Sequence, residues 1–578
     1  MFRKLLGSVR EYKKPTVLTF LFILLEAVIE CLIPFITANL VNRIQAGAEM
    51  PEILRIGALL VVMAMLSLAC GWTAGITAAK ASAGFAKNLR QDAFHRVQTY
   101  AFQNIDKFST SSLVTRMTTD VANVQFAFMM IIRTAVRAPL MLVFSIVMAF
   151  LMGGALATAF VVIIPVLVCG LWLISRRAMP AFRRVFKKYD RLNESIEENV
   201  RGMRVVKGFS REEYEKKKFG DAAGDICRDF TRAERIVALN SPLMQICVYS
   251  NMIFVLLVGS RLVITGAGIG VGEISAMLTY GMQILIQLMM LSMIYVILTM
   301  SAESMKRIAE VLSEESALRN PADPITCVKD GSIELDGVSF KYSEQAEKDA
   351  LSGIDLHIRS GMTVGILGGT GSGKTTLVQL IPRLYDTTVG RVRVGGVDVR
   401  DYDLDTLRGA VAMVLQKNLL FSGTIKENLR WGNENATDEE LIEACRLAQA
   451  DDFIRSFPDG YDTRIEQGGT NVSGGQKQRL CIARALLKKP KILILDDSTS
   501  AVDTKTDAAI RQGFRAFIPE TTKIIIAQRI SSVEDADLIL VMDGGKIVGA
   551  GTHGELLESN EIYKEIYAQQ MGGGGNEE

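Results

Sequence analysis

The sequence predicts two successive parts of different fold class: an α-helical domain of six membrane spans, followed by an α/β domain that includes a helical subdomain. Two observations predict this division. Mean hydropathy is +0.23 although 22% of the residues are charged, so the apolar residues must be gathered into runs. These runs all lie before residue 303, whereas the sequence beyond residue 331 carries charges throughout and alternates strand-like with helix-like patterns.

The charge balance excludes one class of function. The 578-residue chain has 65 Lys and Arg against 63 Asp and Glu, a formal net charge of +2. A protein that binds nucleic acid through bulk charge is strongly basic, so we expect no nucleic-acid partner. The 8 cysteines contain no CxxC spacing and predict neither a zinc site nor a disulfide framework.

Charge-free apolar runs locate the membrane spans. A hydrocarbon core of ~30 Å needs ~20 helical residues. The run from Ala138 to Ser175 is too long for one helix, and Gly153-Gly154 offers the turn that divides it. The first apolar stretch is interrupted only by Glu26 and Glu30. We expect a membrane domain over residues 1–312, with spans at about 16–42, 56–79, 131–152, 155–176, 236–262 and 273–302.

The connections between spans predict the orientation. Those near residues 43–55, 153–155 and 261–273 are short and carry few basic residues, whereas those at 80–133 and 176–235 are long and rich in Lys and Arg. An excess of Lys and Arg marks cytoplasmic loops. We therefore expect a multi-pass protein of the cytoplasmic (inner) membrane, in contact with membrane lipid, whose N-terminus and soluble half lie in the cytoplasm.

The remainder of the chain divides into three segments. Residues 313–330, which include Asn320-Pro321-Ala322-Asp323-Pro324, predict a linker. Residues 331–571 form the predicted α/β domain. The glycine-rich end, residues 572–578, predicts a disordered tail.

A phosphate-binding loop lies near the start of the α/β domain. The apolar strand Thr363–Leu367 leads directly into GGTGSGKT and then into a predicted helix, which is the GxxxxGK[ST] pattern in the context that it requires. Backbone N–H groups in such a loop turn toward phosphate oxygens, and the helix N-terminus adds favourable partial charge. Lys374 is expected to reach the outer phosphates and Thr375 to coordinate Mg²⁺. The expected phosphate-binding residues are Gly368, Gly369, Thr370, Gly371, Ser372, Gly373, Lys374, Thr375 and Thr376.

Two further elements belong with this loop. The strand Lys491–Leu495 ends in Asp496 and Asp497, and a carboxylate in that position can hold Mg²⁺ through water. Upstream, Val-Ser-Gly-Gly-Gln (residues 472–476) precedes a predicted helix over 477–488. Taken alone, Ser-Gly-Gly before a helix predicts a helix cap.

Together these elements resemble the ATP-binding cassette (ABC) exporters over nearly the whole length of the chain. Six spans fused ahead of one P-loop nucleotide-binding domain is the layout of an exporter half-transporter. Residues 472–476 are similar to the family's signature motif, with Val472 where Leu is more usual. The resemblance implies ATP and Mg²⁺ as cofactors and a head-to-tail pair of cassettes. In that pair the ATP of the partner is contacted by Ser473, Gly474, Gly475 and Gln476.

Other positions follow by match to the family. Tyr342 resembles the aromatic residue that stacks on adenine, as aromatic rings stack on any base. Gln416 resembles the Q-loop glutamine, which senses Mg²⁺ and water, and with Thr375 and Asp496 it completes the implied metal site. Ser500–Asp503 resembles the D-loop. Two segments, Phe108–Arg116 and Phe209–Tyr214, resemble the short coupling helices that contact the cassettes, and a solvated helical bend is the alternative for both.

Two catalytic positions depart from the family's pattern. The carboxylate after the magnesium-binding aspartate is normally Glu but is Asp497 here, and the switch histidine is replaced by Gln528. Asp draws the carboxylate back by about 1 Å, and a misplacement of that size can lower a rate by ~10²-fold. Gln cannot accept a proton.

These departures resemble the degenerate-site subunit of bacterial heterodimeric multidrug exporters. We expect a second half-transporter, carrying Glu and His at the matching positions, as the partner in a heterodimer that exports small amphipathic molecules. An ATP-gated channel, and a lipid or peptide exporter, are the alternatives. In the membrane, Glu26 and Glu30 share a helix face and are expected either to bind cationic substrate or to pair with Arg133 and Arg137.

Overall fold

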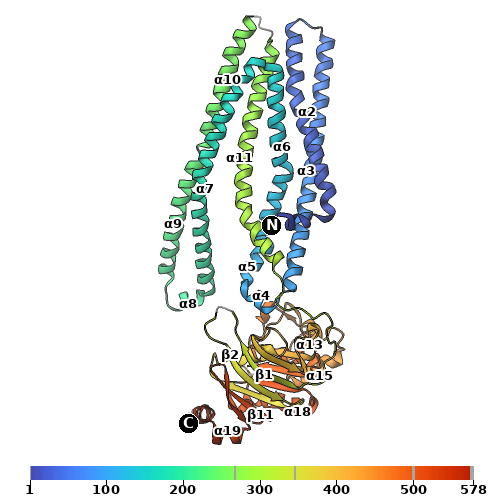
Figure 1. Ribbon diagram of the computed structural model, residues 1–578, viewed down its shortest axis with the longest axis vertical. Helices are drawn as coiled ribbons and strands as arrows, with labels where there is room; N and C mark the ends of the chain where they lie inside the picture. Colours follow the sequence, from blue (N-terminus) through green and yellow to red (C-terminus); the bar gives the residue numbers. More distant parts are fainter. Residues whose placement is uncertain (1, 266–268, 344–345, 498–501, 573–578) are drawn as a thin grey trace. The chain divides into compact units, whose positions relative to one another are not determined.

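The computed structural model describes residues 2–265, 269–343, 346–497 and 502–572 (Figure 1). The chain forms two compact units. The first comprises Met1–Thr99 and Ser109–Glu314, and the second comprises Tyr100–Phe108 and Glu315–Glu578. Each unit has its own hydrophobic clusters.

The first unit is entirely helical over its described residues. Six of its helical stretches are long and apolar enough to cross a membrane, which confirms the predicted number of spans. The turn at Gly153-Gly154 is also confirmed. The helix α6 ends at Gly153, and Gly154 has φ +46. The spans lie in α2 (Lys13–Gln45), α3 (Met50–Gln98), α6 (Val121–Gly153), α7 (Thr158–Arg201), α10 (Asn240–Ile264) and α11 (Val271–Ser313).

The segments expected as long cytoplasmic loops are instead mostly helical. Both α3 and α7 continue well beyond the apolar spans, and α9 (Glu212–Val237) runs beside α7 (Figure 1). Lys188 and Asp229 join these two helices at 2.7 Å. Three acidic residues in the first turn of α9 also interact favourably with the helix dipole. The shorter elements are α1 (Phe2–Gly7), η1 (Arg10–Tyr12), α5 (Thr110–Thr115), the π-helical turn η2 (Arg116–Asp120), η3 (Gly154–Ala157) and α8 (Met203–Gly208).

The second unit is built on a six-stranded sheet in the order β12-β11-β3-β10-β9-β6. All neighbouring pairs are parallel except β11 and β12. A four-stranded sheet has the order β2-β1-β4-β5 and a small sheet pairs β7 with β8. The strands are β1 (Ile333–Phe340), β2 (Leu351–Ile358), β3 (Thr363–Gly368), β4 (Val389–Val394), β5 (Val397–Asp398), β6 (Val411–Val414), β7 (Gly423–Thr424), β8 (Arg464–Ile465), β9 (Ile492–Asp496), β10 (Thr522–Ile526), β11 (Leu538–Asp543) and β12 (Lys546–Gly551).

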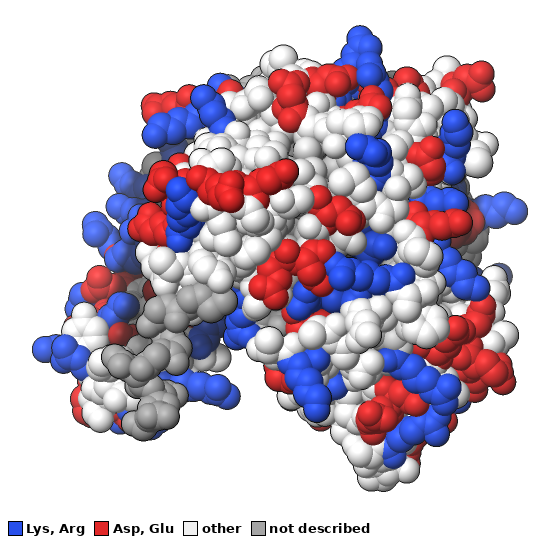
Figure 2. Space-filling model, turned by 90° about the horizontal axis from the view of Figure 1, so that it is seen from below, with Lys and Arg blue, Asp and Glu red and all other residues white. Residues whose placement is uncertain are grey.

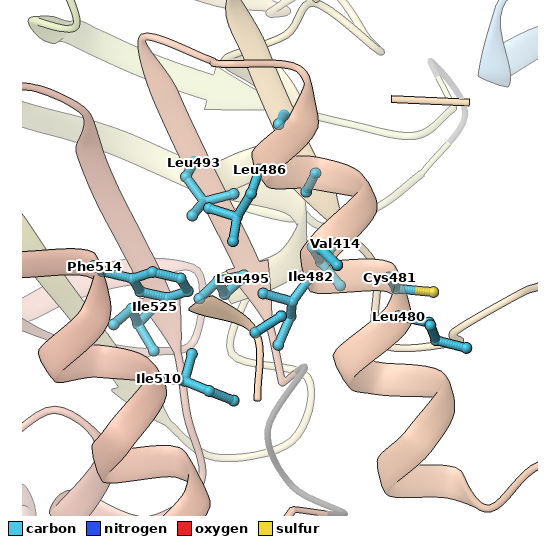
Figure 3. Close-up of a cluster of buried hydrophobic side chains, with 14 of the residues drawn as sticks. Val414, Leu480, Cys481, Ile482, Leu486, Leu493, Leu495, Ile510, Phe514 and Ile525 are labelled. Carbon is cyan, nitrogen blue, oxygen red and sulfur yellow. The ribbon is translucent and has the colours of Figure 1, made fainter. Parts of the chain in front are cut away.

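Both faces of the sheet are buried at the central strands β9 and β10, which explains why these strands are continuously apolar. Successive side chains of β9 alternate between two clusters: Leu493 and Leu495 belong to one, and Ile492 and Ile494 to the other. Figure 3 shows the first cluster, in which residues from α17 and α18 cover the strands. The helices are α12 (Lys374–Leu380), α13 (Leu404–Ala410), α14 (Ile425–Arg430), α15 (Asp438–Leu447), α16 (Asp451–Arg455), α17 (Gly474–Leu487), α18 (Thr504–Phe517), α19 (His553–Ser559) and α20 (Glu561–Gly572).

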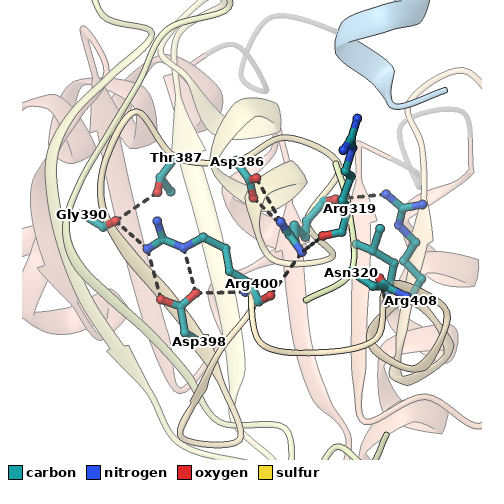
Figure 4. A network of polar contacts seen from close by, with 10 residues as sticks. Arg319, Asn320, Asp386, Thr387, Gly390, Asp398, Arg400 and Arg408 are labelled. Carbon is teal, nitrogen blue, oxygen red and sulfur yellow. Dashed lines mark hydrogen bonds and ion pairs between the residues drawn. The ribbon is translucent and has the colours of Figure 1, made fainter. Parts of the chain in front are cut away.

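The predicted linker, residues 313–330, forms hydrogen bonds with the soluble unit at several positions along its length. Asn320 donates to Asp403 Oδ1 (2.6 Å) and accepts from the Leu404 amide (3.0 Å). Arg383 donates to the Arg319 carbonyl (3.3 Å) within the polar network of Figure 4. The linker is thus held by hydrogen bonds to residues distant in the sequence. The composition of the linker itself does not indicate these bonds. The predicted disordered tail falls almost entirely outside the described residues.

The first predicted coupling segment, residues 108–116, follows a short helix that belongs to the other unit. The helix that belongs to the soluble unit is α4 (Phe102–Lys107), whereas the expected segment, residues 108–116, lies almost wholly in the membrane unit as α5 and the turn that follows it. Asn104 fixes α4 within the soluble unit by donating to the Glu315 carbonyl (2.9 Å) and accepting from the Ala317 amide (3.0 Å).

Charged side chains of both signs are interspersed over the face seen from below (Figure 2). This mixture agrees with the nearly balanced composition of the chain.

Candidate nucleotide site

The candidate site lies where four adjacent parallel strands reach their carboxyl ends. The strands β3, β10, β9 and β6 are consecutive in the sheet. They lead respectively into the phosphate-binding loop, Gln528, the Asp496-Asp497 pair and Gln416. Open α/β sheets bind ligands at this edge. Residues far apart in the sequence are thus brought together by the order of the strands in the sheet.

The phosphate-binding loop turns through conformations that favour glycine. Gly371 and Gly373 have φ +82 and φ +96, and a Cβ on Gly368 would lie 2.2 Å from the Met542 carbonyl oxygen. Lys374 Nζ donates to the carbonyl oxygens of Gly368 (2.9 Å) and Gly369 (2.7 Å), so its ammonium group lies within the loop. Burial lowers the pKa of Lys374, and the nearby carboxylates of the Asp496-Asp497 pair oppose that shift.

Two of the three expected metal ligands, Thr375 and Asp496, contact each other in the structure, whereas Gln416 donates to Asp497. Thr375 Oγ1 donates to Asp496 Oδ1 at 3.1 Å. Burial raises the pKa of Asp496, and the hydrogen bond from Thr375 opposes this effect. Among the described residues no group of three or more His, Cys, Asp or Glu could hold a metal. One carboxylate with a hydroxyl fits Mg²⁺, which is commonly bound by one or two carboxylates together with substrate phosphates and water.

Asp497 is held by two amide side chains. Gln528 Nε2 donates to Asp497 Oδ2 at 2.7 Å, and Gln416 Nε2 donates to the same oxygen at 3.3 Å. The Asp497 backbone has φ +49, a left-handed conformation that costs roughly 1–2 kcal/mol for most residues. Its side chain is largely buried. In the Asp497 carboxylate, which would activate water, one oxygen, Oδ2, therefore accepts two hydrogen bonds.

The predicted adenine-stacking residue is placed beside the phosphate loop. The Tyr342 hydroxyl is hydrogen-bonded to Thr376 Oγ1 (2.9 Å), and its ring is 46% exposed. The ring contacts Phe340 and Tyr385 edge-on, with centroids 4.9 and 5.3 Å away. These contacts fix the plane of Tyr342 while leaving ring surface available to a base.

Tyr385 is a residue that sequence reasoning missed. It touches Tyr342 on one side, and on the other it donates to Asp106 Oδ2 (2.7 Å) and packs against Phe102 of α4. Burial raises the pKa of Tyr385 and the Asp106 carboxylate raises it further. No local pattern distinguishes this tyrosine, because its neighbours come from a segment almost three hundred residues earlier.

The signature residues form a well-capped helix start. The Ser473 side chain accepts from the Gln476 amide (3.3 Å), and Gln476 Oε1 accepts from the Ser473 amide (2.9 Å), which is a capping box. Ser473 and Gly474 are exposed, whereas Val472 is buried. The apolar residue before the cap thus anchors the start of α17. Ser500 and Ala501 of the predicted D-loop lie outside the described residues. Asp503 caps α18 by accepting from the Thr506 amide (2.9 Å).

In the membrane unit both predicted carboxylates contact one arginine. Arg137 Nη2 lies 2.6 Å from Glu30 Oε2, and Arg137 Nε lies 3.4 Å from Glu26 Oε1. Neither carboxylate forms an ion pair with Arg133 in the part of the chain that the structure describes. The observed contacts favour structural pairing through Arg137 over an open cation site.

The sequence matches two family models: the ABC transporter transmembrane region over residues 16–302 and the ABC transporter model over residues 351–500. An uncharacterized ABC transporter ATP-binding protein, YfiB of Bacillus subtilis (strain 168), is 35% identical over 100% of both chains. The structure resembles that of a bacterial Atm1-family ABC exporter with ATP bound, with a TM-score of 0.84, 25% identity, and 97% of this chain and 98% of that chain covered.

Two further relatives have names that describe a substrate. YheI of B. subtilis, a probable multidrug resistance ABC transporter ATP-binding/permease protein, is 34% identical over 84% of this chain and 83% of its own. A fatty acid ABC transporter ATP-binding/permease protein of Mycobacterium bovis (strain ATCC BAA-935 / AF2122/97) is 34% identical over 83% of this chain and 75% of its own.

Proposed function

The chain belongs to the ABC transporter family, with the organisation of an exporter half-transporter, and we propose that it is the degenerate-site subunit of a heterodimeric exporter. In this proposal it lies in the cytoplasmic membrane and exports small amphipathic molecules at the expense of ATP. The observation that carries the proposal is the arrangement around Asp497, whose carboxylate accepts from both Gln528 and Gln416. A carboxylate so engaged is poorly placed to polarise water.

The binding half of the site is intact in this proposal. Lys374 would exchange its two loop carbonyls for the outer phosphates, and the Thr375 hydroxyl, the Asp496 carboxylate and Gln416 are the residues that would hold Mg²⁺. When bound, Mg²⁺ supplies charge neutralisation to the phosphates. Tyr342 presents its exposed ring to adenine. The site of this chain's own P-loop therefore binds ATP firmly and seldom hydrolyses it.

The partner completes the second site. Ser473 and Gly474 are exposed at the start of α17, where the backbone N–H groups of the first helical turn and the helix dipole favour an anion. We infer that they contact ATP bound to a partner half-transporter that carries Glu and His at the positions of Asp497 and Gln528. Hydrolysis takes place mainly in that second site, which combines the partner's P-loop with this chain's signature residues.

The proposed substrate class rests on two observations. Relatives similar along most of this chain are named for multidrug resistance and for fatty acid transport, and both names describe apolar or amphipathic molecules. In the membrane unit, Arg137 contacts both Glu26 and Glu30, so their charges are partly neutralised. An amphipathic substrate needs no free carboxylate for recognition.

The transport test uses inverted membrane vesicles that contain this chain and its partner. We expect ATP-dependent accumulation of an amphipathic dye against its gradient, which a gated channel cannot produce. The variants Glu26→Gln and Glu30→Gln are expected to affect folding more than selectivity. Loss of cation export alone, with folding and transport of neutral substrates intact, would instead assign these carboxylates to the substrate.

A further inference from the structure

The C-terminal helix reaches the backbone of the predicted switch segment, which we define as residues 527–532. Gln570, near the end of α20, donates from Nε2 to the Gln528 carbonyl oxygen at 2.8 Å. Its Oε1 accepts from the Ile530 amide at 2.9 Å. One side chain thus satisfies a backbone acceptor and a backbone donor two residues apart, as a neighbouring strand would.

The helix that carries Gln570 is firmly anchored. Tyr563 is fully buried in the cluster beneath α17 and α18, and its hydroxyl lies 2.6 Å from His553 Nδ1. Tyr567 packs against the same cluster. Residues 563, 567 and 570 share one face of a helix by their spacing, so the burial of the two tyrosines fixes where Gln570 lies.

The switch segment that Gln570 contacts also reaches Asp497 in the candidate nucleotide site. The Gln528 side chain donates to Asp497 Oδ2 at 2.7 Å, and Ser532 donates to Asp507 Oδ2 at 3.1 Å. The segment also forms one wall of a cavity of about 130 Å³ that Asp497 lines. The backbone of the segment is therefore held by α20, while its Gln528 side chain contacts Asp497.

We propose that Gln570 is a positioning residue that fixes the switch segment and thereby sets how long nucleotide stays in this chain's P-loop site. If the side-chain amide of Gln570 is removed, the Ile530 N–H loses its acceptor and the Gln528 carbonyl loses its donor. Gln528 is then free to leave Asp497, and the edge of the site loosens. The kinetic part of this proposal rests on the proposed ATP-binding function, whereas the structural part stands on the two hydrogen bonds alone.

The chain offers a matched control one residue away. Gln569 is exposed on the same helix and donates to Glu565 of its own helix at 3.3 Å. The variant Gln570→Met preserves side-chain length and removes both hydrogen bonds, and Gln569→Met makes the same chemical change away from the switch segment. Gln570→Glu keeps an acceptor for the Ile530 amide but cannot donate to the Gln528 carbonyl.

The experiment compares these full-length variants by hydrogen–deuterium exchange and by release of a fluorescent ATP analogue. In Gln570→Met we expect exchange of the Ile530 amide to rise about tenfold, as expected for the loss of about one hydrogen bond, and release of the analogue to become severalfold faster. Gln570→Glu should lie between Gln570→Met and the wild type, and Gln569→Met should match the wild type. Exchange in β9 and β10 reports whether each variant remains folded.

Three outcomes would overturn the inference: unchanged Ile530 exchange in Gln570→Met, unchanged analogue release despite faster exchange, or equal effects of Gln569→Met. An analogue that fails to bind the wild type would contradict the proposed function instead. The exchange result at Ile530 would still decide whether Gln570 fixes the segment.

Discussion

Asp497 and Gln528 act as a pair in this structure. The Gln528 amide donates to the carboxylate at 2.7 Å, whereas an imidazole at that position could accept a proton as well as donate one. Changing only one of the two residues leaves the other mismatched. The two departures from the family's pattern therefore belong to one local arrangement and are expected to be non-additive.

The first prediction tests this pairing. In the chain purified without a partner, Asp497→Glu alone and Gln528→His alone should each raise ATP turnover by less than about threefold, because the remaining residue is still misplaced. The double variant should raise turnover by more than about tenfold. Steady-state phosphate release measures all three. A full recovery in either single variant would contradict the pairing.

The second prediction concerns pH and Asp496. Burial raises the pKa of this carboxyl above its unfolded value, so the folded apo protein gains stability from it at low pH and loses that contribution as pH rises through the folded pKa. Mg²⁺ needs the ionised form. The increase in ATP affinity that Mg²⁺ provides should therefore be smaller at about pH 5 than at about pH 7.5.

Asp496→Asn is the control for this measurement. Equilibrium titration with a fluorescent ATP analogue, with and without Mg²⁺, should show little effect of Mg²⁺ in the variant at either pH. A Mg²⁺ effect that is constant across the pH range in the wild type would argue against Asp496 as the ligand.

Sequence reasoning predicts residue positions better than residue contacts. The strand–loop–helix pattern predicts that Lys374 and Thr375 follow a loop at the end of a strand, and both begin α12 after β3, because this spacing is local. The contacts of Tyr385 with Asp106, and of Gln570 with Gln528, join distant segments through tertiary packing. No periodicity or short motif carries that information.

At the scale of elements, the approach of α2 and α11 depends on a glycine. A Cβ on Gly272 would lie 2.1 Å from the Ala38 carbonyl oxygen, and the Gly272 amide donates to Asn42 Oδ1 at 2.7 Å. Small residues let membrane helices approach this closely. Asn42 also donates to Glu273 at 2.9 Å, which ties the start of α11 to the end of α2.

The third prediction follows from that contact. Gly272→Ala should destabilise the protein by roughly 1–3 kcal/mol, because the added methyl group must separate two packed backbones. Gly57→Ala, in α3, meets nothing within 4 Å and should be neutral or slightly stabilising, as Ala is the better helix former. Thermal unfolding of the purified protein compares them. Equal melting temperatures would contradict the packing account.

The sequence predicts the membrane spans well, but it predicts the secondary structure of the long charged segments poorly. Spans are recognisable because their length must match the bilayer. The charged segments between them looked like loops, yet α9 and the end of α7 are continuous helices stabilised by contacts such as Lys188 with Asp229. Likewise, only tertiary contacts assign α4 to the soluble unit, and no sequence pattern distinguishes it from residues 108–116.

At the scale of the whole molecule, one chain supplies half of an exporter. It has six candidate spans within its described residues and one nucleotide-binding domain. A homodimer would contain two sites with Asp497 and Gln528, and both would turn over slowly. In the proposed heterodimer the exposed signature of this chain instead serves the site that hydrolyses.

The measurement that tests this account most directly is steady-state ATP turnover of the chain alone and with a partner half-transporter carrying Glu and His. We predict slow turnover alone and rapid turnover of the pair. In the pair, the partner's Glu→Gln variant and Ser473→Arg in this chain should each abolish turnover, whereas Asp497→Asn should leave most of it. Rapid turnover by this chain alone, or equal losses from Asp497→Asn and the partner's Glu→Gln variant, would contradict the account.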